Sequence, residues 1–364
     1  KKVLGKKIIL PLSGGLDSRT LLVPIRKRKN VILCSYEFEN GISEITTAKK
    51  LAAIYKLPLY TKIIQKGYLW NKIDEIYQLN KCFTDFTHPR QIDALDEWRG
   101  LGDVVLLGHW GDVLFDRQSD SRNKCYDKQL VDLRNKILKP SGVELAEDLW
   151  SFWGMSGTYI SFITERLDFL YSSINIDDPS AKFRAFKSKY WAPKWTSINS
   201  SMFNALGEAI YPYYSNKMCK FICTIPESYL SDRKIQIEYI KQNSSSIASI
   251  PWQKVHPLNL NNYQLFNTPQ YYIIRILRKI KRLFYQVYSN DPKLITRNWE
   301  LQFLGDSNLL QLEYFLLKHK NFKIIPKYII VKYLVKFKKN PVKYAHSICM
   351  ILTLIIFSDK HYKK

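Results

Sequence analysis

The 364-residue sequence is poor in cysteine, in acidic residues and in long hydrophobic runs. Its six cysteines are scattered and form no Cys-x-x-Cys pair, which argues against a zinc or iron–sulfur centre and is typical of buried thiols in a reducing cytoplasm. The longest apolar run, Ser347 to Phe357, is too short to span a bilayer, so we expect no transmembrane segment. No signal peptide or internal repeat is visible. These absences predict a folded, cytoplasmic chain.

The shortage of acidic residues leaves a strong positive charge. The chain has 56 Lys and Arg residues and 32 Asp and Glu residues, which gives a formal net charge of +24. From Tyr263 to Lys364, 19 basic residues face 5 acidic ones, a difference of +14 and more than half of the total. Such an excess suits binding to nucleic acid, to an anionic membrane surface or to an acidic substrate. A lysine-rich composition that covers solvated faces gives the same excess, so the charge alone does not choose a partner.

The first third of the chain alternates short apolar strands with helices. Because the strands are apolar on both faces, this alternation predicts an α/β fold with a doubly wound parallel sheet. From about residue 143 the pattern becomes mainly helical, after a polar, charged boundary at 118–143. We therefore expect three consecutive parts: an α/β core at 1–125, a helical substrate-side part at 126–262 and a basic helical extension at 263–364. The expected strands lie near 7–12, 31–36, 57–64 and 103–107, and the expected later helices include 217–223, 232–242, 270–288, 309–318 and 342–357.

The sequence Ser-Gly-Gly-Leu-Asp-Ser at 13–18 joins the first strand to a helix. Its two glycines permit a positive φ and a close approach of the backbone to a ligand. Successive N–H groups and the helix N-terminus would then point at one anion, and the hydroxyls of Ser13 and Ser18 add donors. Asp17 offers a hard oxygen ligand for Mg²⁺. The stretch predicts a phosphate site, although it lacks the Gly-x4-Gly-Lys-Ser/Thr pattern of the Walker A loop.

This loop resembles the pyrophosphate loop of the N-type ATP pyrophosphatases, the family of asparagine synthetase, GMP synthetase, NAD synthetase and several tRNA-modifying enzymes. The resemblance implies an adenine nucleotide α-hydrolase-like sheet, ATP and Mg²⁺ as cofactors, and a substrate oxygen that attacks the α-phosphorus while the loop holds the pyrophosphate.

A second motif, Leu-Gly-His-Trp-Gly-Asp-Val-Leu-Phe at 107–115, follows the strand near 103–107. It looks like the Ser-Gly-x-Gly-x-Asp-Glu-Leu-Phe signature of the asparagine synthetase synthetase domain. The resemblance implies that Asp112 is the second magnesium ligand beside Asp17, because two carboxylates at two strand ends can share one ion. A helix N-cap is the other interpretation of Asp112.

Three residues depart from that signature. Trp110 replaces its second glycine, Val113 replaces its glutamate, and His109 stands where asparagine synthetases have an acidic residue that is held to help ammonia react with the acyl-adenylate. A neutral imidazole at His109 could accept a proton near pH 7, although a lone histidine is more often structural. These changes leave the nucleophile open.

Two later segments also resemble the family. Glu208 and Pro212 match its Glu-Val-Arg-Val-Pro-Phe-Leu-Asp-His-Arg stretch, whereas its arginine is Ile210 here and its aspartate is Ser215. Ile-Pro-Trp-Gln-Lys at 250–254 resembles the segment whose lysine reaches the α-phosphate, which makes Lys254 a candidate cation for the pentavalent phosphorus. A surface lysine is the other interpretation of Lys254.

The resemblance thus implies a complete set of site residues. The catalytic candidates are Lys254, His109 and Glu208, and the metal ligands are Asp17 and Asp112. The residues expected around ATP are Pro11, Ser13, Gly14, Gly15, Asp17, Ser18, Tyr36, Leu107 and Gly108.

The family's glutamine-hydrolysing domain, with its amino-terminal cysteine nucleophile, would precede Lys1. Either it was removed, a separate glutaminase chain supplies ammonia, or the nucleophile is another amine. A homodimer is one assembly that the sequence allows.

The leading hypothesis is an ATP-dependent amide ligase that adenylates a small-molecule carboxylate, with aspartate to asparagine as the default pair by resemblance. A sugar acid or a peptide is the alternative substrate. A tRNA-modifying enzyme would use the basic tail for phosphates, but no RNA-recognition motif supports nucleic acid as the partner. A third class is a membrane-surface protein, because Tyr271 to Tyr288 has the composition of an interfacial basic helix.

Overall fold

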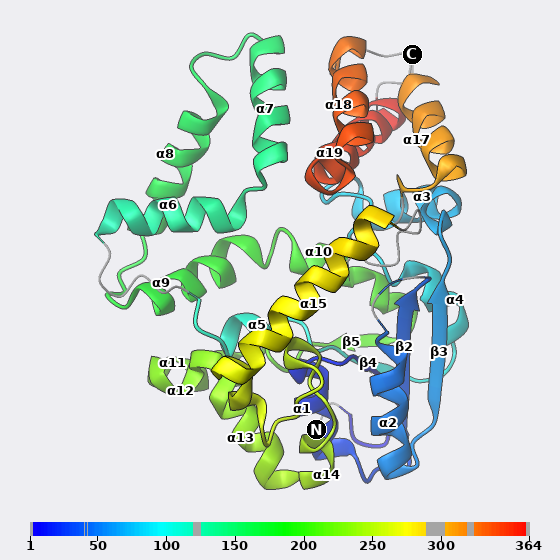
Figure 1. The fold of residues 1–364 in the computed structure, drawn as a ribbon, viewed down its shortest axis with the longest axis vertical. Helices are drawn as coiled ribbons and strands as arrows, with labels where there is room; N and C mark the ends of the chain where they lie inside the picture. The colour runs from blue at the N-terminus through cyan, green and yellow to red at the C-terminus, as the bar shows by residue number, and fades with distance from the viewer. Residues whose placement is uncertain are drawn as a thin grey trace. The chain divides into compact units, whose positions relative to one another are not determined.

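The computed structural model divides into two compact units, each assembled from three segments of the chain (Figure 1). The structure describes residues 3–39, 41, 43–118, 125–288, 303–318 and 324–361. Unit 1 consists of Lys1–Gln65, Gln91–Arg117 and Ser201–Thr296, and unit 2 of Lys66–Arg90, Gln118–Ser200 and Arg297–Lys364. Each unit thus combines segments that are far apart in the sequence, whereas we expected three consecutive parts from local patterns, which do not show which distant segments pack together.

Unit 1 contains a five-stranded parallel sheet in the order β3-β2-β1-β4-β5. The expected parallel α/β sheet is thereby confirmed. The three-residue strand β5 was not expected as a strand. The strands are β1 (Ile8–Pro11), β2 (Val31–Phe38), β3 (Leu59–Ile64), β4 (Val104–Leu106) and β5 (Glu208–Ile210).

The central strand β1 is apolar because both of its faces are covered. Ile8, Ile9 and Leu10 have no exposed surface, although successive side chains of a strand point to opposite faces of the sheet. The helices of unit 1 are α1 (Leu16–Ile25), α2 (Ile45–Tyr55), α4 (Ile92–Trp98), α5 (Gly111–Leu114), α11 (Asn216–Cys223), α12 (Glu227–Leu230), α13 (Lys234–Asn243), α14 (Ser245–Ala248) and α15 (Pro269–Tyr288), with short 3-10 turns η2 (Ser201–Ala205), η3 (Ser231–Arg233), η4 (Gln253–Val255) and η5 (Tyr263–Asn267).

The strand order places the two sequence motifs next to each other. The chain runs from β1 outward to β2 and β3, and then returns to pair β4 with the other edge of β1. Ligands of such sheets bind beyond the carboxyl ends of the strands where this direction reverses, here between β1 and β4. The loop at 13–18 follows β1, and the motif at 107–115 follows β4.

Unit 2 is helical among its described residues. It consists of α3 (Tyr68–Asn80), α6 (Tyr126–Ile137), α7 (Pro140–Phe152), α8 (Tyr159–Ser172), α9 (Pro179–Phe186), a π-helical turn η1 (Lys187–Trp191), α10 (Thr196–Ser200), α17 (Asp306–Lys318), α18 (Lys327–Lys339) and α19 (Pro341–His361). The expected helices near 309–318 and 342–357 are confirmed. Helices α3 and α18 were not among those expected.

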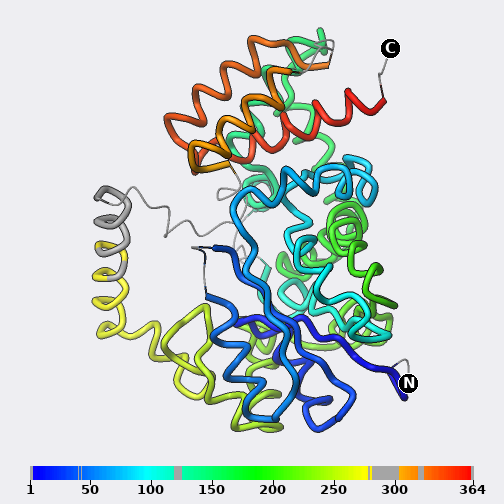
Figure 2. The backbone as a smooth tube through the Cα atoms, turned by 90° about the vertical axis from the view of Figure 1, so that its right-hand side faces the viewer, coloured from blue at the N-terminus to red at the C-terminus, as the bar shows by residue number. Residues whose placement is uncertain are grey.

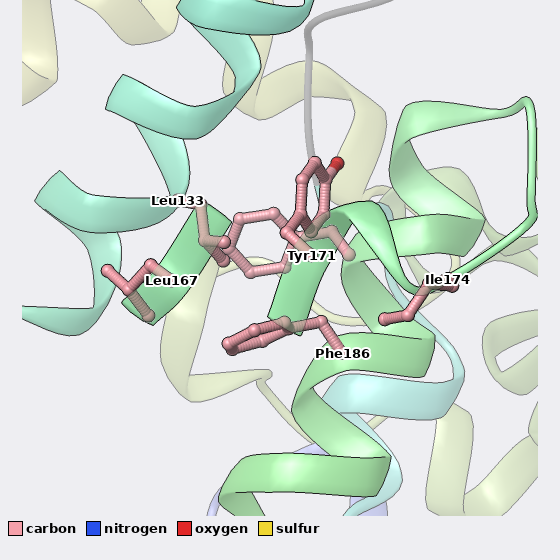
Figure 3. Close-up of a cluster of buried hydrophobic side chains, with 6 residues drawn as sticks. Leu133, Leu167, Tyr171, Ile174 and Phe186 are labelled. Carbon is pink, nitrogen blue, oxygen red and sulfur yellow. The ribbon is translucent and has the colours of Figure 1, made fainter. Parts of the chain in front are cut away.

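The stretch at 118–143, expected to be a polar boundary, contributes helix α6 to a core of unit 2. Leu133 of α6 is fully buried against Leu167 and Tyr171 of α8 and Phe186 of α9 (Figure 3). The sequence did not indicate this helix, because its other side chains are mostly charged or polar and one buried leucine gives only a weak periodic signal.

Among the described residues, one helix is long and apolar enough to cross a membrane by length and composition alone. This helix, α19, extends beyond the apolar run at 347–357, and 61% of its most apolar window is buried inside the protein. Helices α7, α17 and α18 pack against it. This burial is typical of a core helix.

The sheet allows a matched test of burial. We predict that Ile9→Ala lowers the free energy of unfolding by about 2–5 kcal/mol, because it leaves a cavity at a fully buried site. Ile63→Ala on the edge strand β3, where 49% of the residue surface is exposed, should cost about 1 kcal/mol or less. Urea denaturation measures both, and equal losses would contradict the burial of β1.

Candidate active site

The loop at 13–18 uses its glycines for close packing. Neither Gly14 nor Gly15 has a positive φ, so the loop does not use the conformational freedom that its glycines permit. Gly15 is extended (φ −79°, ψ 177°) and precedes the first turn of α1. A Cβ atom on Gly14 would lie 3.0 Å from the Cβ of Gln253. Gly14 is therefore required by the nearness of the 250–254 segment.

The amides of the loop are paired inside the protein. The N–H of Ser13 donates to the Oγ of Ser18 at 3.1 Å, and the N–H of Gly15 donates to the Oγ of Ser13 at 3.2 Å. The N–H of Gly14 donates to the carboxylate of Glu44 at 2.8 Å. We expected these amides to point at one bound anion, but in the structure they donate to groups of the protein itself. No side chain caps α1, so its first turn and the two serine hydroxyls form the anion-attracting part of the loop.

A buried arginine holds the 250–254 segment against the loop. The guanidinium of Arg19 donates to the carbonyl oxygens of Ile250 at 2.9 Å, of Gly14 at 3.2 Å and of Pro251. Burial lowers the pKa of Arg19 to about 10, and the charge of Glu44 opposes that shift. Two of these carbonyl groups, those of Ile250 and Pro251, are more than two hundred residues away in the sequence, so no local pattern indicates this role of Arg19.

Asp17 is the most heavily contacted group of the loop. Its carboxylate accepts hydrogen bonds from Arg233 and, at 3.2 Å, from the side-chain amide of Gln236, while the hydroxyl of Tyr213 donates to its carbonyl oxygen at 2.8 Å. Burial raises the pKa of Asp17, Arg233 opposes this shift, and the charge of Asp112 adds to it. The sequence analysis did not assign roles to Arg233, Gln236 or Tyr213, since no local pattern marks them.

The motif after β4 lies directly against Asp17. A Cβ atom on Gly111 would stand 2.6 Å from the Cγ of Asp17, so only glycine leaves room for the carboxylate. The preceding Trp110 has φ 78°, the left-handed conformation that glycine adopts easily, at the position where the resembled signature has glycine. Asp112 is exposed in the first turn of α5, and its charge acts on Asp17. The structure therefore brings the two expected metal ligands into one site.

These two carboxylates fit a magnesium ion that is shared with phosphate. Among the described residues no group of three or more His, Cys, Asp or Glu could hold a metal ion. Mg²⁺ is usually held by one or two carboxylates together with phosphate oxygens and water, so a closed protein cage is not needed. The pair Asp17 and Asp112 suits that mode.

His109 is neutral near pH 7. Its Nδ1 is buried and has no hydrogen-bond partner among the residues that the structure describes. Its ring lies 6.0 Å from that of Phe203 and 6.4 Å from that of Tyr211 between centroids. Burial lowers the pKa of His109 to about 4, and the charge of Asp112 opposes this shift. An unprotonated imidazole beside the Asp112 carboxylate can accept a proton or a hydrogen bond.

Lys254 is exposed, and its Nζ lies 5.6 Å from the centroid of the Trp252 ring. Its charge reaches Asp116, a residue that sequence reasoning missed. Burial raises the pKa of Asp116, and the charges of Lys254 and Arg233 oppose that shift. Asp116 directly follows the motif at 107–115, and this position was the only feature of the sequence that could have indicated it as a site residue. The carboxylates of Asp17, Asp112 and Asp116 thus lie within electrostatic reach of at least one of the cations Arg233 and Lys254 or of one another.

Glu208 lies away from this site. It is the first residue of β5, pairs in register with Val104 at the beginning of β4, and forms an ion pair with Lys6 at 2.8 Å. The beginning of a parallel strand is at the sheet edge opposite its carboxyl end, so the structure places Glu208 across the sheet from Asp17. We therefore leave Glu208 out of the proposed site.

The remaining expected residues lie around the carboxyl edge of the sheet. Pro11 ends β1, and Gly108 is close to Asp17, since a Cβ atom on it would lie 3.3 Å from the Asp17 Cβ. Leu107 donates its N–H to Ile210 at 2.9 Å. Tyr36 lies on β2, and its hydroxyl accepts a hydrogen bond at 3.0 Å from Gln91.

The buried imidazole predicts a pH dependence of stability. Between its ordinary pKa near 6.5 and its folded pKa of about 4, His109 takes up a proton in the unfolded chain but not in the folded one. The free energy of unfolding should therefore decrease as the pH falls through this window, by up to about 1.4 kcal/mol per pH unit from this group. In His109→Gln the decrease should be smaller, as measured by urea denaturation at several pH values. Identical slopes for the two proteins would contradict a buried neutral His109.

No protein-family model matches this sequence, and no curated protein is significantly similar to it. An assignment of function must therefore start from the residues and the geometry described above.

Proposed function

We propose that this chain is an ATP-dependent ligase that activates a carboxylate by adenylation and then forms an amide. The observation that supports this most directly is the contact between the two motifs, in which Gly111 leaves space for the Asp17 carboxylate and Asp112 lies within its electrostatic reach. In this proposal the sheet is of the adenine nucleotide α-hydrolase type, and ATP binds beyond the ends of β1 and β4.

The first half-reaction is the attack of a substrate carboxylate oxygen on the α-phosphorus of ATP, which breaks the bond to the β-phosphate and releases pyrophosphate. The first turn of α1 and the hydroxyls of Ser13 and Ser18 provide positive potential and donors for the pyrophosphate. A magnesium ion on Asp17 and Asp112 would neutralise its charge. Arg233, which pairs with Asp17 in the structure, would be available to contact phosphate oxygens if a cation took its place at Asp17.

The second half-reaction is the attack of ammonia or another amine on the acyl-adenylate, which displaces AMP. Lys254 lies in the 250–254 segment, which Arg19 holds against the loop at 13–18, and we propose that it is the cation that contacts the α-phosphate. His109 is unprotonated near pH 7 and so suits the removal of a proton from the attacking amine. A separate glutaminase chain is one source of the ammonia.

Aspartate to asparagine is the default reaction by resemblance, and a different carboxylate is the alternative. The surroundings of His109 favour the alternative, because a neutral ring next to Phe203 and Tyr211 replaces an acidic group. A sugar acid or a peptide is the alternative carboxylate that we propose for these surroundings.

The proposal predicts carboxylate-dependent exchange between ATP and labelled pyrophosphate. With the right carboxylate from a panel of amino acids, sugar acids and peptides, the wild type should exchange, and Asp17→Asn should be slower by roughly 100-fold or more because it loses a metal ligand. Glu208→Gln is the matched control, since it makes the same change at the opposite sheet edge and should retain exchange.

The glycines of the second motif give a graded series in the same assay. Gly111→Ala should abolish most exchange, because its methyl group meets the Asp17 carboxylate, whereas Gly108→Ala meets its nearest atoms at 3.3 Å and should cost less. Exchange with no carboxylate of the panel, or full exchange by Asp17→Asn, would refute the proposed reaction.

A further inference from the structure

Helix α15 exposes a row of large apolar side chains. Ile273, Leu277 and Ile280 have 61%, 60% and 54% of their surface exposed, and Ile276 lies between them in the same row. These positions follow the spacing i, i+3, i+4 and i+7, so they form one stripe along the helix. In Figure 2 the helix, in yellow, stands clear of the other coloured segments of unit 1.

The opposite side of α15 is basic. The helix contains five Lys or Arg residues and no Asp or Glu. Arg275 and Lys279, one turn apart and outside the apolar stripe, are both exposed. Among the described elements, α15 packs mainly against the short turn η5, so the core of unit 1 does not cover this stripe.

We propose that α15 lies in the interface of a membrane that contains anionic lipids, with its apolar stripe in the acyl region and its basic side chains at the headgroups. A helix with isoleucine and leucine on one face and Lys and Arg on the other is the form that interfacial helices take. The absence of acidic residues in α15 complements a negative surface.

Other partners fit these side chains less well. In a pair of α15 helices from two copies of the chain, the basic residues would find no acidic partner on the other helix. Nucleic acid would satisfy Arg275 and Lys279 but would leave the exposed stripe of Ile273, Leu277 and Ile280 in water. A bilayer covers the stripe and neutralises the charges together.

Flotation with phosphatidylcholine vesicles that contain phosphatidylglycerol tests the proposal on the full chain. The wild type should float with these vesicles and bind pure phosphatidylcholine much less. Ile273→Ser/Leu277→Ser should lose binding by removing the apolar contact. Arg275→Glu/Lys279→Glu should weaken it by at least about 25-fold, since each basic residue at the surface contributes about fivefold.

Two control variants test whether a loss of vesicle binding is specific to α15. Lys49→Glu/Lys50→Glu makes the same change of charge on exposed residues of α2 and should float like the wild type. Asp17→Asn should also float, because binding through α15 does not depend on the proposed catalysis. Circular dichroism checks that each variant is folded.

Four results would overturn the proposal. The first is equal binding by wild type and Ile273→Ser/Leu277→Ser, and the second is an equal loss in the α2 control. The third is a wild-type dimer that Ile273→Ser/Leu277→Ser converts to a monomer while vesicles do not bind, which would assign the stripe to a contact between copies. Binding of poly(U) but not of vesicles would likewise contradict a lipid partner.

Discussion

The site depends on keeping the charge of Asp17 in a largely buried position. A carboxylate without a partner is costly there, and burial accordingly raises its pKa. Arg233, 216 residues later in the sequence, forms an ion pair with this carboxylate. Gly111, in the segment after β4, has no side chain and so leaves room for the carboxylate. Three distant segments therefore meet at one carboxylate. In the proposed reaction a divalent cation would take the place of Arg233 as the partner of Asp17, and Arg233 would then be available to contact the pyrophosphate oxygens.

The residues that differ from the pattern of the resembled family each have a defined place in the structure. Arg19 ties the loop to the 250–254 segment through three carbonyl oxygens, and Trp110 adopts a left-handed conformation in place of a glycine. His109 presents a neutral ring where an acidic residue is expected. The first two changes alter how the site is held together, whereas the third alters what it offers to a substrate. This distinction is why we propose the chemistry more specifically than the carboxylate.

Short-range patterns predicted the sheet better than the site. The strands β1 and β4 are short apolar runs, which is typical of the buried strands of a parallel sheet, and the two motifs follow them. Strand β5 and helix α6 were missed because each gives a short or weak signal. The amide of Gly14 donates to Glu44, and Asp17 pairs with Arg233, contacts between residues 30 and 216 positions apart. No periodicity encodes such contacts, so the partners of the loop could not be predicted from sequence.

We propose that ATP is cleaved between its α- and β-phosphates at the Asp17 loop. Phosphorus NMR of a complete reaction, with ATP, Mg²⁺, the carboxylate and an ammonium salt, distinguishes this cleavage from the alternative. We expect AMP and pyrophosphate in equal amounts, formed together with the amide. Formation of ADP and inorganic phosphate instead would show that the bond between the β- and γ-phosphates is cleaved and would refute the proposal.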